Sequence, residues 1–186
     1  VNDGVIGELQ YIYSNRLNLG KIRTEENVFW SLAPHDIAIF QYITDSIPKY
    51  IQSKGSTFLQ KGIPDSTLTH LEYPSGIKAH SFVSWLHPFK EHRLVVIGSK
   101  GMITLEDSII GKPLKLYSKT FDFIDGVPEK IDGPVEIINY DSTLPLDKEL
   151  KYFLKNLKNK TSTTSGLDHG LGVMKTLVDA SEQLLA

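Results

Sequence analysis

The chain has 186 residues, 40% of them hydrophobic and 23% charged, which is the size and composition of one globular domain over 1–186. Its 20 basic and 22 acidic residues are interspersed and give a formal charge of −2, so a nucleic-acid surface is not expected. Cysteine is absent, which excludes disulfides and thiolate chemistry and fits a cytoplasmic protein, and no apolar run reaches the roughly 20 residues of a membrane span.

The first expected element is a strand over 6–17, which is rich in aromatic and branched residues. After a polar stretch, a helix is expected from Leu32 to about Ser46, just before Pro48. Apolar residues at spacings of seven and four predict its buried face, formed by Leu32, Ile39, Ile43 and Ile47.

The next hundred residues alternate between apolar and polar, which predicts strands in "YIQSKGSTFLQKG", "STLTHLEY", "IKAHSFVSWL", "HRLVVIGS", "MITLED", "LKLYSK" and "VEIINY". Turn sequences at 74–76 and 98–101 separate neighbouring strands without a helical crossover, so the pairing should be antiparallel. The strand "IKAHSFVSWL" is bulky on both faces. The second face of the sheet is therefore expected to meet another subunit or a further domain.

Two helices are expected at the carboxyl end of the chain. Their apolar residues are Leu146, Leu150, Phe153, Leu154 and Leu157 in the first, and Leu171, Met174, Leu177, Val178 and Leu185 in the second. The order of strand, helix, many strands and two helices predicts an α+β fold, in which an open, mostly antiparallel sheet carries helices on one face.

His35 is the leading candidate for chemistry. Pro34 fits the first turn of a helix, so His35 should lie at the amino end, where the helix dipole disfavours imidazolium. A neutral imidazole there can act as a general base. Its spacing from Ser31 and Ile39 places it at the border of the buried stripe, so it should not point freely into water, and a purely structural histidine is the alternative.

Asp36 lies about 100° around the helix from His35 and is expected only to stabilise the first turn. A first polar cluster could bind an anionic ligand such as a nucleotide sugar, with surface ion pairs as the alternative explanation, and residues of a second cluster could face a ligand. The candidate substrate-binding residues are Asn15, Arg16, Asn18 and Arg23 in the first cluster, and His87 and Lys90 in the second.

Other kinds of site find less support. The histidine spacings do not suggest a metal site, and "GLDHGLG" does not follow a strand as a dinucleotide-binding loop would. A metal-free hydrolase that uses His35 and Asp36 is the weakest interpretation, because no serine lies in a Gly-x-Ser-x-Gly turn.

Four stretches in series, "SNRLNLGKIR", "NVFWSLAPHDI", "SFVSWLHPFKEHRLVVIGSKGMITLED" and "LPLDKELKYFL", resemble the carboxyl-terminal domain of the Gfo/Idh/MocA oxidoreductases. The resemblance covers nearly the whole chain and is greatest to nucleotide-sugar dehydrogenases that act on UDP-N-acetylhexosamines. It implies a dihydrodipicolinate-reductase-like fold. It also implies a preceding Rossmann domain that binds NAD or NADP and a Glu-Lys-Pro segment with a catalytic lysine, so the chain is expected to be part of a longer enzyme and inactive alone.

By the same resemblance, His35 would be the catalytic acid/base for interconversion of a sugar hydroxyl and a carbonyl. Many members of the family carry aspartate four residues before this histidine, where this chain has Ser31. The resemblance further implies a homo-oligomer that assembles through the sheet face, no metal, and no cofactor-binding residue within this chain. The alternative function is a non-catalytic sugar-binding or assembly module with a structural His35.

Overall fold

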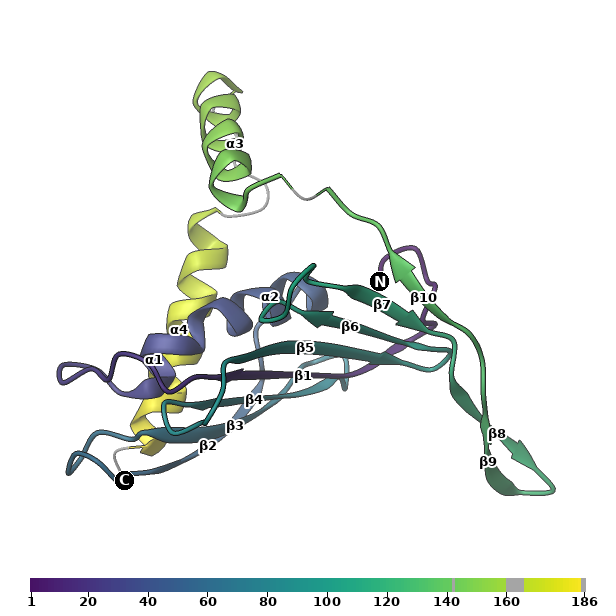
Figure 1. Cartoon of the computed structure of the whole chain (residues 1–186), viewed down its shortest axis with the longest axis horizontal. Helices are drawn as coiled ribbons and strands as arrows, with labels where there is room; N and C mark the ends of the chain where they lie inside the picture. Colours follow the sequence, from purple (N-terminus) through teal and green to yellow (C-terminus); the bar gives the residue numbers. More distant parts are fainter. Residues whose placement is uncertain (142, 160–165, 185–186) are drawn as a thin grey trace.

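A computed structural model describes residues 1–141, 143–159 and 166–184 of the chain. One open sheet carries helices on one of its faces, with a hairpin and a further helix projecting from it (Figure 1). The elements are β1 (Leu9–Leu17), α1 (Val28–Leu32), α2 (Pro34–Thr44), β2 (Tyr50–Ser56), β3 (Ser66–Glu72), β4 (Lys78–Ser84), β5 (Glu91–Gly98), β6 (Met102–Glu106), β7 (Leu114–Tyr117), β8 (Thr120–Ile124), β9 (Val127–Ile131), β10 (Val135–Ile138), α3 (Pro145–Asn159) and α4 (Leu167–Leu184).

Within the part of the chain that the structure describes, the main sheet has eight strands in the order β10-β7-β6-β5-β1-β4-β3-β2. All neighbours are antiparallel except β1 and β4, which pair in parallel at the centre of the sheet. The predicted α+β class with a mostly antiparallel sheet is therefore confirmed. Among the described residues, the remaining two strands, β8 and β9, pair only with each other.

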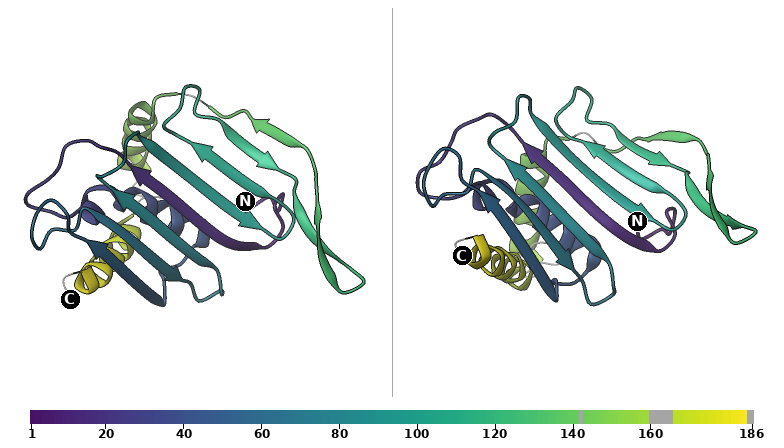
Figure 2. Two further views of the ribbon diagram at one scale, coloured as in Figure 1. Left: turned by 60° about the horizontal axis from the view of Figure 1, so that its bottom comes forward. Right: turned by 90° about the horizontal axis from the view of Figure 1, so that it is seen from below.

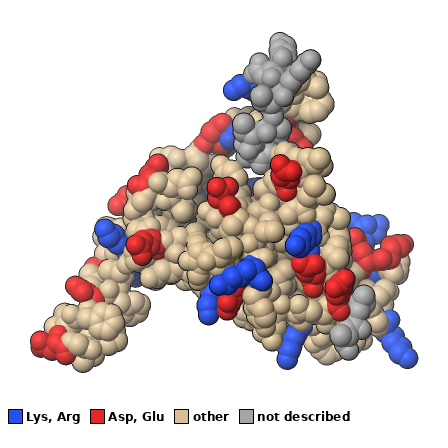
Figure 3. All heavy atoms as spheres, turned by 180° about the vertical axis from the view of Figure 1, so that it is seen from behind, with Lys and Arg blue, Asp and Glu red and all other residues tan. Residues whose placement is uncertain are grey.

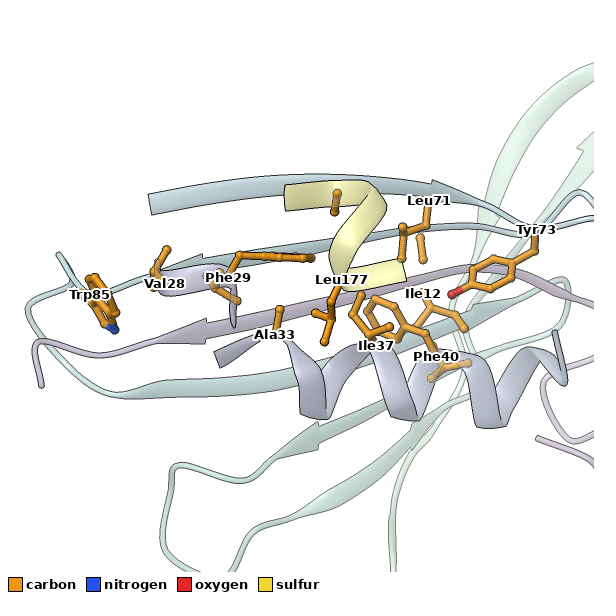
Figure 4. Packing of buried hydrophobic residues seen from close by; sticks show 14 of the residues in the cluster. Ile12, Val28, Phe29, Ala33, Ile37, Phe40, Leu71, Tyr73, Trp85 and Leu177 are labelled. Atoms are coloured by element: carbon orange, nitrogen blue, oxygen red, sulfur yellow. The ribbon is translucent and has the colours of Figure 1, made fainter. Parts of the chain in front are cut away.

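Helices α1, α2 and α4 cover one face of the sheet and leave the other face open (Figure 2). The core lies between these two layers, where Ile37 and Phe40 of α2 approach Leu177 of α4 and Tyr73 of the sheet (Figure 4). All four side chains are at most 1% exposed. Burial of apolar surface between the helices and the sheet is the main stabilisation of the domain.

The predicted buried stripe of α2 is wrong. Ile37 and Phe40 are buried together with Asp36 and Gln41, whereas Ile47 is exposed and Leu32, Ile39 and Ile43 are only partly buried. The helix starts anew at Pro34 after the short helix α1, so a spacing counted from Leu32 runs across the junction between two helices.

Helix α4 turns small residues toward the rest of the domain. Gly172, Thr176 and Ala180 are buried at intervals of four. Of the expected stripe, Leu177 is buried, whereas Leu171, Met174 and Val178 are exposed. A β-carbon on Gly172 would lie 2.7 Å from Nε2 of Gln41, so the glycine allows α2 and α4 to approach closely. Leu185 of the expected stripe lies outside the described residues.

Helix α3 forms where the sequence predicts it but stands away from the sheet (Figure 1). Its five large apolar side chains, Leu146, Leu150, Phe153, Leu154 and Leu157, are 52 to 62% exposed. The second projecting element is the β8–β9 hairpin, which was not among the expected strands. Its turn is Asp125-Gly126, with φ values of 52° and 80°, as a tight two-residue hairpin turn requires.

Candidate functional site

The site is built around the junction of α1 and α2. Helix α1 begins after Asn27, whose side chain accepts a hydrogen bond from the Trp30 amide at 3.1 Å. Pro34 is the first residue of α2 and His35 the second. The His35 side chain is exposed, so it is more open to solvent than its spacing from Ser31 and Ile39 suggested. An imidazole at this position is free to meet a ligand or another domain.

Asp36 anchors this turn to the sheet. Its carboxylate accepts hydrogen bonds from Nη2 of Arg16 at 2.9 Å and from Nε of Arg16 at 3.2 and 3.3 Å. The two side chains are only 16% and 5% exposed, for Arg16 and Asp36 respectively. Asp36 therefore does more than stabilise the helix end, because it ties the start of α2 to the end of β1.

Two further groups surround this ion pair. Nδ1 of His92 on β5 lies 3.4 Å from Nη1 of Arg16, and 4.0 Å from the carboxylate of Asp107. Burial and then the charges of Arg16 and Lys90 lower the pKa of His92, although Asp107 and Asp36 oppose this effect. A small cavity of about 80 Å³ lies between these side chains. The arrangement favours the uncharged form of this imidazole beside the guanidinium.

The other predicted ligand residues do not all gather here. Asn15 faces the open side of the sheet, where Nδ2 donates to Glu91 at 2.8 Å. His87 also approaches Glu91, at 4.0 Å, and packs edge-on against Phe89. Lys90 is exposed, and its charge acts on His92. The candidate residues therefore divide between the two faces at one end of the sheet.

Asn18 and Arg23 lie in the exposed loop before α1. The guanidinium of Arg23 is 3.8 Å from the carboxylate of Glu26, and Glu26 lines an open cleft of about 400 Å³ beside Trp30 and Ile63. This cleft is next to α1 and could admit a ligand near the α1–α2 junction.

The open face carries a cluster of rings that sequence spacing did not reveal. Tyr13 stacks on His80, with ring centroids 5.1 Å apart, and the Tyr11 hydroxyl hydrogen-bonds to Nδ1 of the same histidine. Burial and the neighbouring His70 lower the pKa of His80. Within the described ranges, no group of three histidine, aspartate or glutamate side chains is placed to hold a metal ion. No described helix is long and apolar enough to cross a bilayer.

Sequence reasoning missed His92, Asp107 and Glu91 as neighbours of the candidate residues. His92 lies opposite Arg16 in the antiparallel register of β1 and β5, which pairs residues 76 positions apart. The alternation along β5 places His92 on the helix side of that strand, but it does not reveal which strand is its neighbour.

Solved structures with the same fold include oxidoreductases. The chain superposes with a TM-score of 0.78 on UDP-N-acetylglucosamine 3-dehydrogenase GnnA from Acidithiobacillus ferrooxidans, at 17% identity over 99% of this chain and 57% of that one. For aldose-aldose oxidoreductase from Caulobacter crescentus the TM-score is 0.76, at 15% identity over 98% and 55%. For a protein from Desulfitobacterium hafniense DCB-2 named for NADPH-dependent oxidoreductase activity it is 0.78, at 15% identity over 99% and 57%.

The chain thus spans a little over half the length of these structures, and at such identities the likeness shows the fold. A comparison with curated proteins found no match. The family model described as the GFO/IDH/MocA C-terminal domain matches residues 1–104, which is more than half of the chain and includes β1 to β5, α1, α2 and the residues around His35. The chain therefore belongs to the GFO/IDH/MocA family and corresponds to its C-terminal domain.

Proposed function

We propose that the chain is the substrate-binding and oligomerisation domain of an NAD(P)-dependent sugar or nucleotide-sugar oxidoreductase, with His35 as its acid/base. The observation that carries this proposal is the exposed imidazole at the start of α2, on a turn that the Arg16–Asp36 ion pair fixes to the sheet. The names of two structures with this fold, a UDP-N-acetylglucosamine 3-dehydrogenase and an aldose-aldose oxidoreductase, favour sugar substrates.

The chemistry requires one proton transfer to a side chain of this domain. When a sugar hydroxyl is oxidised to a carbonyl, a hydride leaves the carbon and the hydroxyl proton must be accepted by a base. Bound nicotinamide supplies the hydride acceptor. His35 takes the hydroxyl proton, and it returns the proton when the reaction runs toward the alcohol.

Arg16 acts in this proposal by positioning His35, since its guanidinium is already engaged by Asp36. The exposed Arg23 and Lys90 and the partly buried Asn18 are the candidate contacts for the anionic part of a nucleotide sugar, and Asn15 and His87 would bind at the opposite side of the same sheet end.

A second lobe that binds the nicotinamide cofactor is part of the proposal. The related structures are nearly twice as long as this chain. Helix α3 presents five large apolar side chains to solvent, and an exposed apolar patch of this kind usually marks a surface that another domain or chain covers. We assign the covering partner to a Rossmann domain in the full-length cytoplasmic enzyme.

The open sheet face is the proposed oligomer contact. It carries the Tyr11, Tyr13 and His80 rings together with Leu68, which is 40% exposed. Aromatic side chains with little conformational freedom are enriched at protein interfaces. A second copy of the domain would cover them.

The test of the catalytic role uses the full-length protein, UDP-N-acetylglucosamine and NAD or NADP. His35→Gln should lower kcat/KM by about 10² to 10⁴ because it removes the base, with little effect on cofactor binding. Tyr42→Phe, an exposed change on the same helix, should leave turnover unchanged. Full turnover by the His35→Gln enzyme would instead support the non-catalytic sugar-binding or assembly module.

A further inference from the structure

The β8–β9 hairpin has the form of an arm that reaches past the sheet. It leaves the β7–β10 edge and extends toward the side of the sheet that the helices do not cover (Figures 1 and 2). Five of its apolar side chains are 40 to 70% exposed: Phe121, Phe123, Ile124, Val127 and Ile131. Such an arm, named here the hairpin arm (residues 118–134), buries little apolar surface in the isolated chain.

One face of the hairpin arm combines acidic and apolar pairs. Asp122 lies directly opposite Glu129, and Ile124 directly opposite Val127 at the tip. Like charges in opposite positions of a hairpin repel each other, and neither carboxylate has an ion-pair partner among the described residues. Acidic side chains are visible at the end of the projecting arm (Figure 3). A cationic partner would relieve this repulsion.

A groove of complementary character lies at the other edge of the sheet, between the start of β2 and α4. Its volume is about 510 Å³, and its lining includes the apolar residues Ile47, Pro48 and Tyr50 and the cations Lys49 and Lys175. Ile47 and Tyr50 are 41% and 53% exposed. Both lysines are exposed and have no carboxylate partner among the described residues, although Asp179 also lines the groove. This surface is named here the β2 groove.

The hairpin arm and the β2 groove lie at the two ends of one row across the sheet. The strand registers link Tyr50, Glu72, Lys78, Tyr11, Ile97, Met102, Tyr117 and Val135 in that order. The hairpin arm begins directly after Tyr117 and ends directly before Val135, whereas Tyr50 lines the groove. The base of the hairpin arm and the β2 groove therefore lie at the same position along the strand direction, at opposite edges of the sheet.

The positions of the hairpin arm and the β2 groove are compatible with a two-fold symmetric dimer. If two open faces pack together about an axis parallel to the strands, the β10 edge of each copy lies against the β2 edge of its partner, and both contacts are identical. Packed sheets lie about 10 Å apart, whereas a five-residue strand such as β8 is about 17 Å long. The hairpin arm is thus long enough to pass the partner's sheet and enter the groove beside its helices.

We propose that the hairpin arm of each copy binds in the β2 groove of a second copy, with Asp122 and Glu129 facing Lys49 and Lys175 and with Ile124 and Val127 on the apolar lining. The inference rests on the oligomerisation through the open face proposed above, and it adds the orientation of the two copies and the residues that fix it.

A charge exchange tests the proposal in the full chain. The arm variant carries Asp122→Lys and Glu129→Lys, and the groove variant carries Lys49→Glu and Lys175→Glu. In sedimentation velocity and native mass spectrometry, each variant alone should dimerise at least tenfold more weakly than the wild type. An equimolar mixture should form heterodimers of wild-type strength, because both contacts of the mixed pair then join opposite charges.

Lys151→Glu with Lys155→Glu on α3 changes the net charge by the same amount and in the same direction as the groove variant does, and it should leave dimerisation unchanged. Circular dichroism should show that all variants are folded. Ile124→Ser, which removes an apolar contact at the tip of the hairpin arm without changing its charge, serves as a second weakened variant. Wild-type dimerisation by the arm and groove variants alone, no recovery in the mixture, or a monomeric wild type would each overturn the proposal. Turnover of the full-length enzyme reports separately on the proposed dehydrogenase function.

Discussion

The guanidinium of Arg16 and the carboxylate of Asp36 form a forked ion pair that joins the end of β1 to the first turn of α2. Both groups are largely withdrawn from solvent, and each is the other's nearest opposite charge. Because His35 is the neighbour of Asp36 in the chain, the position of its backbone depends on this pair. The pair is thus a determinant of both stability and site geometry.

Asp36→Ala should lower the free energy of unfolding by about 2 to 4 kcal/mol, because the Arg16 guanidinium loses its compensating charge in a mostly buried place. Urea denaturation measures the change. Glu72→Ala removes the partner of Lys78 in an exposed pair and should cost less than about 1 kcal/mol. The double variant Arg16→Met, Asp36→Leu should regain much of the loss, and equal losses for Asp36→Ala and Glu72→Ala would contradict the assignment.

The contact of α2 with α4 gives a second prediction. Gly172→Ala should destabilise the domain by about 1 to 3 kcal/mol, because the new β-carbon would lie 2.7 and 2.8 Å from the two amide atoms of Gln41 and 2.8 Å from Cγ2 of Ile47.

The matched control is Gly170→Ala in the same helix, where no heavy atom lies within 4 Å of the new β-carbon. Alanine is the better helix former by about 1 kcal/mol, so this variant should be slightly stabilised. Thermal unfolding of the two variants should therefore shift in opposite directions, and a shared direction would show that the close approach at Gly172 is not limiting.

The titration of two histidines gives a third prediction. Burial lowers the pKa of His80 and of His92 below the ordinary value of 6.5. The unfolded chain therefore binds protons at a higher pH than the folded chain does. The free energy of unfolding should fall as the pH falls through 6.5 toward the folded pKa values, and it should be constant above this range as far as these two groups are concerned.

The measurement is urea denaturation at several pH values between 7 and 5. His80→Gln and His92→Gln should each reduce the slope of stability against pH, and the double variant should reduce it further. An unchanged slope in both single variants would show that neither imidazole is held in its neutral form by folding.

The layer arrangement followed from local patterns in the sequence. Alternation located the strands of the main sheet, Pro34 marked the first turn of α2 although the helix was expected from Leu32, and the apolar spacing located α3. The Asp125-Gly126 pair was an available signal for the β8–β9 hairpin, because this dipeptide suits a tight turn with positive φ at both positions, and it was not used.

The site depended on contacts between distant parts of the chain. Arg16 was expected to bind a ligand, yet Asp36, 20 residues away, occupies its guanidinium, and the register that brings His92 beside it depends on the pairing of β1 with β5. The packing side of α4 also depended on size, since Gly172 is buried beside Leu177 at a point where a β-carbon would lie within 3 Å of a side chain of α2. Neither the spacing nor the polarity of residues in the sequence predicts these contacts between distant parts of the chain.

The parallel pair at the centre of the sheet has a consequence for how the chain acquires its structure. Tyr11 of β1 pairs with Lys78 of β4, and the other side of β1 pairs with residues 91–98 of β5. During synthesis, about seventy residues after β1 must be made before β1 can form backbone hydrogen bonds with a neighbouring strand on either side. Loops of this length close at an entropic cost before their contacts form, so the rate of folding should be limited by the docking of β1 between two hairpin-connected halves.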